Sequence, residues 1–294
     1  MNETGTERPL GRSGMSVPAL GVGTNRWDDN ESDQARLRDT LAAALDVGMG
    51  FFDTAEGYNA GRSETALGEA TREDGRPVLL ASKFAPLPSR VTAAQFGSAL
   101  DGTLERLGRH SLDLYYLHFP HRLLGVGVWM RAMGRAVKAG KIRAVGISNC
   151  NAAQMRKAAD VLARYGVPLA ANQVQYSLLH RKPETDGVLD ACRRTGVALV
   201  AYEPLGGGAV SSASLSGSGR LALADTLREV AAARSATAAQ VALAWLLKRD
   251  DHVIPIPGAT RPEHIRENSG ALSLELSEEE LARIDRVSAP TPPR

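Results

Sequence analysis

The sequence contains little cysteine and almost no net charge. Its two cysteines, Cys150 and Cys192, have no metal-binding spacing and are too few for a disulfide framework, so we expect packing residues in a reducing compartment. Lys and Arg total 35 against 33 Asp and Glu, and no basic run is interleaved with aromatic residues. The sequence therefore predicts no nucleic-acid partner.

Long apolar runs are also missing. No stretch approaches the roughly 20 apolar residues that cross a bilayer, and the opening segment MNETGTERPLGRSGMS lacks the apolar core of a signal peptide. We therefore expect a cytoplasmic protein with no membrane partner. The composition leaves the oligomeric state open.

No Pro/Ser-rich linker divides the chain, and no G-x-G-x-x-G follows its first predicted strand. One low-complexity stretch, Gly206 to Gly219, follows the seventh predicted strand and is typical of a mobile loop rather than a domain boundary. We therefore expect one domain over residues 1–294.

Eight short runs rich in β-branched and aliphatic residues predict buried strands. They are Ala19–Gly23, Phe51–Ala55, Val78–Lys83, Leu112–His118, Ala144–Asn149, Leu169–Tyr176, Ala198–Pro204 and Val253–Gly258. The segments between them have helical periodicity. Four predicted helix starts have capping-box spacing: Thr92 with Gln95, Asn151 with Gln154, Thr237 with Gln240, and Ser277 with Glu280. Eight alternating units predict parallel strands in a closed (β/α)8 TIM barrel rather than an open sheet.

Polar residues that could carry chemistry end the predicted strands, where the active site of such a barrel lies. Asp53 and Tyr58 follow the second strand, Lys83 ends the third and His118 ends the fourth. A tyrosine hydroxyl ordinarily has a pKa of about 10, so it holds its proton at neutral pH and needs help to release it. Lys83 would stabilise the resulting tyrosinate, and Asp53 would hold Lys83 in place.

His118 would orient the oxygen of a substrate carbonyl by donating a hydrogen bond. Taken singly, each of these residues is equally consistent with an ordinary ion pair or with packing, and their combination is the signal. His118 and His121 lack a third ligand at a suitable spacing, so we expect no metal site. The combination indicates carbonyl reduction with Tyr58 as the proton donor.

Longer segments also follow a known pattern. They run from GVGT at residues 21–24 through FDTAEGYN, LLASK, LDLYYLH, KIRAVGISN, NQVQYS and AYEPLGGG to IPGATRPEHIREN. Through these segments the chain resembles the aldo-keto reductase family over nearly its whole length. The resemblance implies that Asp53, Tyr58, Lys83 and His118 form the family's catalytic tetrad, and that a nicotinamide cofactor supplies hydride to an aldehyde or ketone.

The resemblance implies NADPH as the cofactor, with NADH as the less expected alternative. Ser148, Asn149 and Gln173 would bind the nicotinamide carboxamide, and Tyr202 would stack on the nicotinamide ring. The other implied contacts are Gly23, Thr24, Asn25, Asp53, Pro204, Leu205, Gly206, Gly258, Thr260, Arg261, His264, Glu267 and Asn268.

Two positions depart from the family pattern. Glu203 stands where many relatives have serine before the proline, and we expect its side chain to point away from phosphate or to bond a neighbour. Gly258 stands where many relatives have a lysine that pairs with the 2′-phosphate of NADPH. We expect Arg261 and His264 to supply that charge instead.

Aromatic residues near the strand ends are candidates for an apolar substrate pocket. They are Trp27, Phe84, Phe119 and Trp129, which would contact the substrate together with Tyr58 and His118. Nothing in these residues identifies the small-molecule carbonyl substrate.

Three other functions stay open at this point. A nucleotide-binding regulatory subunit would show little turnover, and a Schiff-base lyase would use Lys83 as its nucleophile. A redox-neutral or dehydrating reaction would use the same cofactor site.

Overall fold

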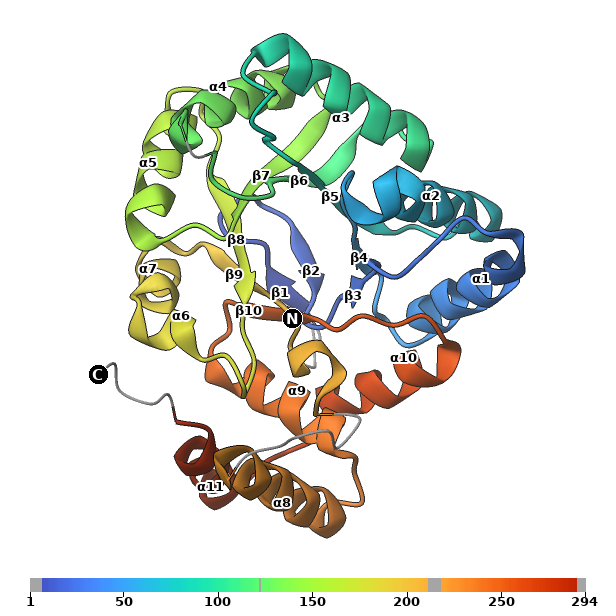
Figure 1. The fold of residues 1–294 in the computed structure, drawn as a ribbon, viewed down its shortest axis with the longest axis vertical. Helices are drawn as coiled ribbons and strands as arrows, with labels where there is room; N and C mark the ends of the chain where they lie inside the picture. Colours follow the sequence, from blue (N-terminus) through green and yellow to red (C-terminus); the bar gives the residue numbers. More distant parts are fainter. Residues whose placement is uncertain (1–6, 122, 211–217, 290–294) are drawn as a thin grey trace.

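The computed structural model describes residues 7–121, 123–210 and 218–289. Within these ranges eight strands form one parallel sheet, in which each strand pairs with its neighbour in chain order. Figure 1 shows the strands at the centre with helices around them, so the predicted (β/α)8 barrel is confirmed. The strands are β3 (Val22–Gly23), β4 (Phe51–Asp53), β5 (Leu79–Phe84), β6 (Leu112–Leu117), β7 (Ile142–Ser148), β8 (Leu169–Gln175), β9 (Ala198–Tyr202) and β10 (Val253–Ile256).

The α-helices lie between or after these strands and surround the barrel. They are α1 (Glu31–Asp46), α2 (Arg62–Asp74), α3 (Ala93–Leu107), α4 (Gly125–Lys138), α5 (Ala152–Ala163), α6 (Lys182–Thr185), α7 (Val188–Thr195), α8 (Ser218–Ala233), α9 (Ala238–Arg249), α10 (Pro262–Ser269) and α11 (Glu278–Ser288). Short 3₁₀ turns are η1 (Tyr58–Gly61), η2 (Gly206–Gly208) and η3 (Gly270–Leu272). The predicted loop over Gly206–Gly219 is thus η2 at one end and the start of α8 at the other, and residues 211–217 lie outside the described ranges.

All four predicted capping boxes are present. The side chains of Thr92, Asn151, Thr237 and Ser277 accept a hydrogen bond from the backbone N–H three residues later, and the Gln or Glu there bonds back to the cap. Each pair satisfies backbone donors that a helix start leaves free. The predicted starts of α3, α5, α9 and α11 are therefore confirmed.

The first and last strands close the barrel. The N–H of Gly21 donates to the carbonyl of Pro255 at 3.0 Å, and that of Gly23 donates to Pro257 at 3.0 Å. Gly23 and Gly258 also form a parallel bridge. β3 is shorter than predicted because its pairing with β4 begins only at Val22.

Two apolar clusters fill the molecule on opposite sides of the sheet. Phe52 packs in the cluster that includes the helices, whereas Phe51 belongs to a smaller cluster made of strand residues and the N-terminal hairpin. That hairpin, β1 (Glu7–Pro9) with β2 (Ser16–Pro18), was not predicted from the sequence. Its residues Leu10 and Val17 are buried in the inner cluster, so the hairpin closes one end of the barrel.

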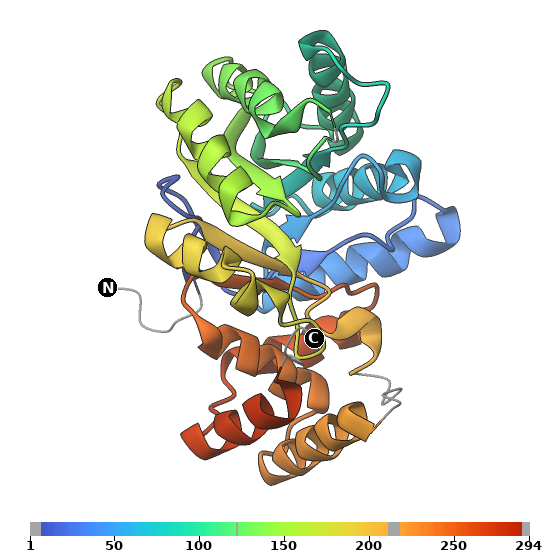
Figure 2. The same cartoon turned by 60° about the vertical axis from the view of Figure 1, so that its left-hand side comes forward.

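α8 and α11 pack together at the edge of the barrel, next to α9 (Figures 1 and 2). Arg234, after α8, pairs with Glu280 of α11 at 2.8 Å. In the described part of the chain no single helix has the length and apolarity to cross a membrane. The segments Leu221–Ala233 and Ala238–Arg249 reach that length and composition only when joined across a bend of 94°.

Candidate active site

The ammonium group of Lys83 lies in a buried polar cluster at the carboxyl ends of β4 and β5. Its side chain is fully buried, and Nζ donates to a carboxylate oxygen of Asp53, to the carbonyl of Thr54 at 2.8 Å and to the Tyr58 hydroxyl at 3.1 Å. β4 pairs directly with β5, which brings Asp53 next to Lys83. The three protons of the ammonium group are therefore all used, and one of them points at Tyr58.

Electrostatics hold Lys83 in its charged form. Burial acts to lower the pKa of Lys83, but Asp53 and Tyr58 outweigh it, and that pKa lies above its ordinary value. The other carboxylate oxygen of Asp53 accepts from the side-chain amide of Gln173 at 2.7 Å. Asp53 thus has a hydrogen-bond partner on each carboxylate oxygen. It holds Lys83 in position.

The ring of His118 lies against the ring of Tyr58. The two rings meet edge to face, with centroids 5.8 Å apart and an interplanar angle of 85°. Burial, and secondly the charge of Lys83, lowers the pKa of His118 to about 3. The imidazole is therefore neutral at physiological pH and carries a proton on one nitrogen only.

The turn that carries Tyr58 is fixed by side chains on either side of it. Glu56 accepts from the backbone N–H of Ala85 at 2.6 Å and pairs with Arg90. Asn59 has a φ of +48° and donates its side-chain amide to the carbonyl of Trp27 at 2.7 Å. These bonds join the turn to the segments after β5 and β3 and so limit the positions that Tyr58 can take.

The second histidine of the β6–α4 loop has a different role. Nδ1 of His121 accepts the backbone N–H groups of Leu123 and Leu124 at 3.1 and 3.0 Å, so this ring stabilises the approach to α4. Within residues 7–121, 123–210 and 218–289, no group of three His, Cys, Asp or Glu side chains is arranged to hold a metal ion.

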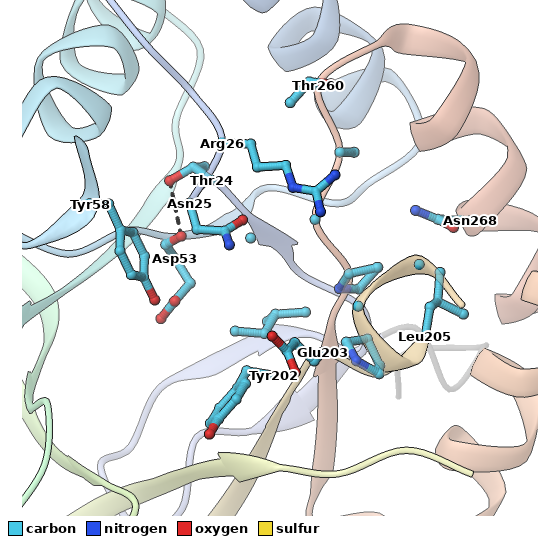
Figure 3. A pocket seen from close by; sticks show the side chains of 18 of the residues that line it. Thr24, Asn25, Arg26, Asp53, Tyr58, Tyr202, Glu203, Leu205, Thr260 and Asn268 are labelled. Carbon is cyan, nitrogen blue, oxygen red and sulfur yellow. Dashed lines mark hydrogen bonds between the residues drawn. The ribbon is translucent and has the colours of Figure 1, made fainter. Parts of the chain in front are cut away.

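A cavity of about 640 Å³ opens beside Tyr58 and His118 and runs across the carboxyl ends of the strands. This volume lies in the range of sites for cofactors and drug-sized ligands. Figure 3 shows Tyr58 and Asp53 on one side of the cavity and the segment with Tyr202 and Leu205 on another. Thr260 and Asn268 mark its far end, so the cavity is elongated and has Tyr58 near one end only.

The walls near Tyr58 present hydrogen-bonding groups and one aromatic face. The Tyr202 hydroxyl donates to the side-chain oxygen of Asn149 at 3.0 Å, and the Ser148 hydroxyl donates to the carbonyl of Gln173 at 2.9 Å. These bonds orient four of the predicted cofactor residues toward the same space. Such a set of amides, a hydroxyl and a ring suits a flat, neutral carboxamide ligand.

The segment after β9 presents backbone rather than side chains. Gly206, Gly207 and Gly208 all have positive φ values, a conformation that side chains disfavour. Glu203, which precedes them, also has a positive φ of +49°, and its carboxylate accepts from the amide of Gln175 at 2.7 Å. The expectation that Glu203 bonds a neighbour is confirmed, although the residue still lines the cavity.

A sequence model of the Aldo/keto reductase family matches residues 19–289 of this chain. The chain belongs to the aldo/keto reductase family. It is 33% identical to the aldo-keto reductase yakc [NADP(+)] of Schizosaccharomyces pombe, over 92% of this chain and 88% of that protein. It is 31% identical to a chloroplastic pyridoxal reductase of Arabidopsis thaliana, over 95% of this chain and 85% of that protein.

A solved structure of an aldo/keto reductase from Klebsiella pneumoniae, in complex with NADP and acetate, is similar to this reductase over its whole length. The TM-score is 0.84 and the sequence identity 32%, with 98% of this chain and 97% of the other covered. The barrel architecture is therefore that of the family.

Most cofactor contacts predicted for this reductase lie on the cavity. The predicted residues that line it are Gly23, Thr24, Asn25, Asp53, Ser148, Asn149, Gln173, Tyr202, Pro204, Leu205, Gly258, Thr260, His264, Glu267 and Asn268. Gly206 and Arg261 are not among the lining residues, whereas Gly207 and Gly208 are. Arg261 instead forms the exposed N-cap of α10.

The substrate contacts predicted for Trp27 and Phe84 need correction. Both side chains are fully buried, and Trp129 is buried with them. Trp27 donates its indole N–H to the carbonyl of Ala259 at 2.7 Å, and the Phe84 ring packs on Trp129 with centroids 4.8 Å apart. Phe119 is 37% exposed and lies beside His118, but it does not line the cavity.

Sequence reasoning missed one charged residue of the cavity in this reductase. Arg26 lines the wall formed by the first strand, directly after Asn25, and lies beside the segment with Gly258 and Thr260. Its position in the sequence is the signal that could have identified it. Arg26 stands between Asn25 and Trp27, which are both predicted to be site residues.

Proposed function

We propose that this protein reduces an aldehyde or ketone to the alcohol with NADPH, and that Tyr58 gives its proton to the substrate oxygen. The observation that carries the proposal is the hydrogen bond from Lys83 to the Tyr58 hydroxyl, 3.1 Å long, at the end of an elongated cavity. Membership of the aldo/keto reductase family supports the reaction class.

NADPH as the cofactor is supported by the relatives and by the lining of the cavity. The name of the Schizosaccharomyces pombe relative includes NADP(+), and the similar Klebsiella pneumoniae structure contains NADP. Ser148, Asn149 and Gln173 would bind the carboxamide of the nicotinamide, and Tyr202 would lie against its ring. When bound, the reduced nicotinamide supplies the hydride.

The residues around Tyr58 divide the remaining work. The charge of Lys83 stabilises the tyrosinate left after proton transfer, and Asp53 keeps Lys83 in place. His118, neutral because the pKa of its ring is lowered to about 3, donates a hydrogen bond to the substrate oxygen and positions it near Tyr58.

The same cluster argues against a Schiff-base lyase. A lysine nucleophile must be neutral and must reach its substrate. Lys83 is fully buried, its pKa is raised, and its three protons bond to Asp53, Thr54 and Tyr58. A regulatory subunit would keep the cavity but lack turnover, so the rate of NADPH oxidation separates it from a reductase.

The test is to mix the purified protein with NADPH and a panel of aldehydes and ketones and to follow absorbance of the reduced nicotinamide. Pyridoxal belongs in the panel because one relative is named a pyridoxal reductase. We predict that Tyr58→Phe lowers kcat by about 10²–10⁴-fold while the Kd for NADPH changes little, because the variant loses the proton donor alone.

Tyr165→Phe is the matched control, since Tyr165 packs against α4 on the outside of the barrel and should leave kcat unchanged. Normal turnover by Tyr58→Phe would refute the role of Tyr58. NADPH binding without oxidation by any carbonyl would favour the regulatory subunit or a very selective enzyme.

A further inference from the structure

A second pocket, of about 520 Å³, lies along helix α3, apart from the proposed cofactor cavity. Among the described residues, no residue lines both spaces. The second pocket passes Ala94, Ser98 and Gly102, and Arg90 and Arg106 also line it. Residues four apart share one face of a helix, so this pocket, called the α3 pocket below, follows α3 for about 12 Å.

Arg106 presents an unused donor group to the α3 pocket. Its Nε donates to Glu64 at 2.7 Å and its Nη2 to the Thr103 hydroxyl at 3.4 Å, whereas Nη1 has no partner in the described part of the chain. A Cβ atom on Gly102 would lie 3.1 Å from Nη1. Because residue 102 is glycine, no side chain covers Nη1, and its N–H groups are open to the pocket.

Arg90 presents a second guanidinium group. Its Nη1 donates to Glu56 and to the carbonyl of Ala85 at 3.1 Å, which leaves Nε and Nη2 without a partner among the described residues. The guanidinium carbon also lies 5.4 Å from the centroid of the Phe84 ring. These contacts hold the guanidinium in place before any ligand binds, which reduces the entropy cost of binding.

The carboxylates that pair with the two arginines are less exposed than the arginines. The side chains of Arg90 and Arg106 are 27% and 33% exposed, whereas those of their partners Glu56 and Glu64 are 8% and 0% exposed. The buried carboxylates therefore orient the arginines, and the free guanidinium N–H groups face the pocket. An anion can bond to these N–H groups without breaking either ion pair.

We propose that the α3 pocket binds a small organic anion with a negatively charged group at each end, of the dicarboxylate or phosphorylated carboxylic acid class. Arg90 precedes the first turn of α3 and Arg106 lies in its last turn, so each guanidinium would bond one end of the anion. Carboxylate and phosphate oxygens both match the paired N–H groups of arginine. The inference does not depend on the proposed function, because the α3 pocket is separate from the cofactor cavity.

Both arginines also contact the turn that carries Tyr58. Arg90 pairs with Glu56 at the start of the turn. At its end, a Cβ atom on Gly61 would lie 2.9 Å from Cδ and Nε of Arg106. An anion bonded to both arginines therefore holds the two ends of the turn, and its binding stabilises the position of Tyr58.

Isothermal titration calorimetry with succinate, 3-phosphoglycerate and acetate tests the site. Succinate has two carboxylates, and 3-phosphoglycerate has a carboxylate and a phosphate, so their relative affinities identify the preferred group. We expect the preferred anion to bind with a Kd of about 1 mM or below. Acetate has one charged group and should bind at least about tenfold more weakly, because it cannot reach both arginines.

Two variants locate the binding site. Ser98→Glu places a carboxylate in the α3 pocket and leaves both ion pairs intact, so it should raise the Kd at least about tenfold. Arg106→Lys keeps a cation beside Glu64 but removes Nη1, and it should also weaken binding. Ala153→Glu is the matched control, because it adds the same charge at an exposed position of α5 and should bind the anion like wild type.

Hydrogen exchange of a peptide spanning residues 56–61 measures the coupling to Tyr58. The preferred anion should slow exchange there in wild type and in Ala153→Glu but not in Ser98→Glu. The site is refuted if wild type binds neither succinate nor 3-phosphoglycerate, or if Ser98→Glu binds the anion as tightly as wild type, since the anion would then lie elsewhere. Binding that leaves exchange in residues 56–61 unchanged would reject the coupling.

Discussion

At the scale of single residues, burial decides the charge of His118. Its pKa is lowered from 6.5 to about 3, first by burial and then by the charge of Lys83. The unfolded chain binds a proton at this residue as the pH falls below 6.5, whereas the folded chain does not until about pH 3. The stability associated with His118 is thus fully present above pH 6.5 and is lost as the pH falls toward 3.

We predict that protonation of His118 in the unfolded state removes about 2 kcal/mol of unfolding free energy between pH 7 and pH 4.5. Urea unfolding of wild type and His118→Gln across this range measures the effect, and the variant should lack that part of the pH dependence. His110→Gln is the control, because His110 is exposed before β6. Parallel curves for wild type and His118→Gln would disprove the assignment.

The sequence predicted where residues lie along the strands better than which way they point. Asp53 and Lys83 could be placed because each ends a buried run, and parallel strands bring such ends together. Phe84 was misplaced because successive side chains of a strand point to opposite faces. Lys83 bonds within the site, so the next residue must face the helices, and its ring packs on Phe96 and Trp129.

At the scale of helices, α2 and α3 approach each other at one glycine. A Cβ atom on Gly68 would lie 2.5 Å from the carbonyl oxygen of Arg106 and 2.8 Å from the Cα of Leu107. These are backbone atoms, which cannot move without shifting α3. Gly97, in the middle of α3, has no atom within 4 Å of its added Cβ.

We predict opposite effects for the same substitution at these two glycines. Gly97→Ala should raise the free energy of unfolding by about 0.5–1 kcal/mol, because alanine restricts the unfolded chain and favours helix. Gly68→Ala should lower it by about 1–3 kcal/mol through overpacking. Chemical denaturation of both variants tests the difference, and stabilisation by Gly68→Ala would show that α2 and α3 do not pack as described.

Helix starts were predictable and the N-terminal hairpin was not, for one physical reason. A capping box such as Thr92 with Gln95 is a local arrangement that four consecutive residues complete. The strands Glu7–Pro9 and Ser16–Pro18 are too short to show periodicity. Their burial depends on the barrel end that they cover, which no local segment of sequence contains.

At the scale of the whole molecule, the first and last strands form both the closure of the barrel and one side of the cavity. Arg26 follows β3, and Gly258 and Thr260 follow β10. A ligand that contacts both segments therefore resists their separation. This resistance is a thermodynamic effect, because a ligand that binds only the folded state stabilises the folded state.

We predict that NADPH at a hundred times its Kd raises the free energy of unfolding by about 2.7 kcal/mol. Amide hydrogen exchange should slow most at Gly21, Gly23, Val253, Ile254 and Ile256, which lie in the closure, and least in α3. Mass spectrometry of exchanged peptides with and without NADPH measures this pattern. Equal slowing in α3 and in the closure would contradict a ligand that bridges the two strands.

The separation of β3 and β10 along the chain determines when the barrel can close during synthesis. β3 leaves the ribosome about 230 residues before β10, its partner in the closure. At translation rates of about 5–20 residues per second, β3 waits on the order of ten to fifty seconds with one edge uncovered. The nascent chain therefore acquires a closed barrel and a complete nucleotide cavity together, and only after β10 has been synthesised.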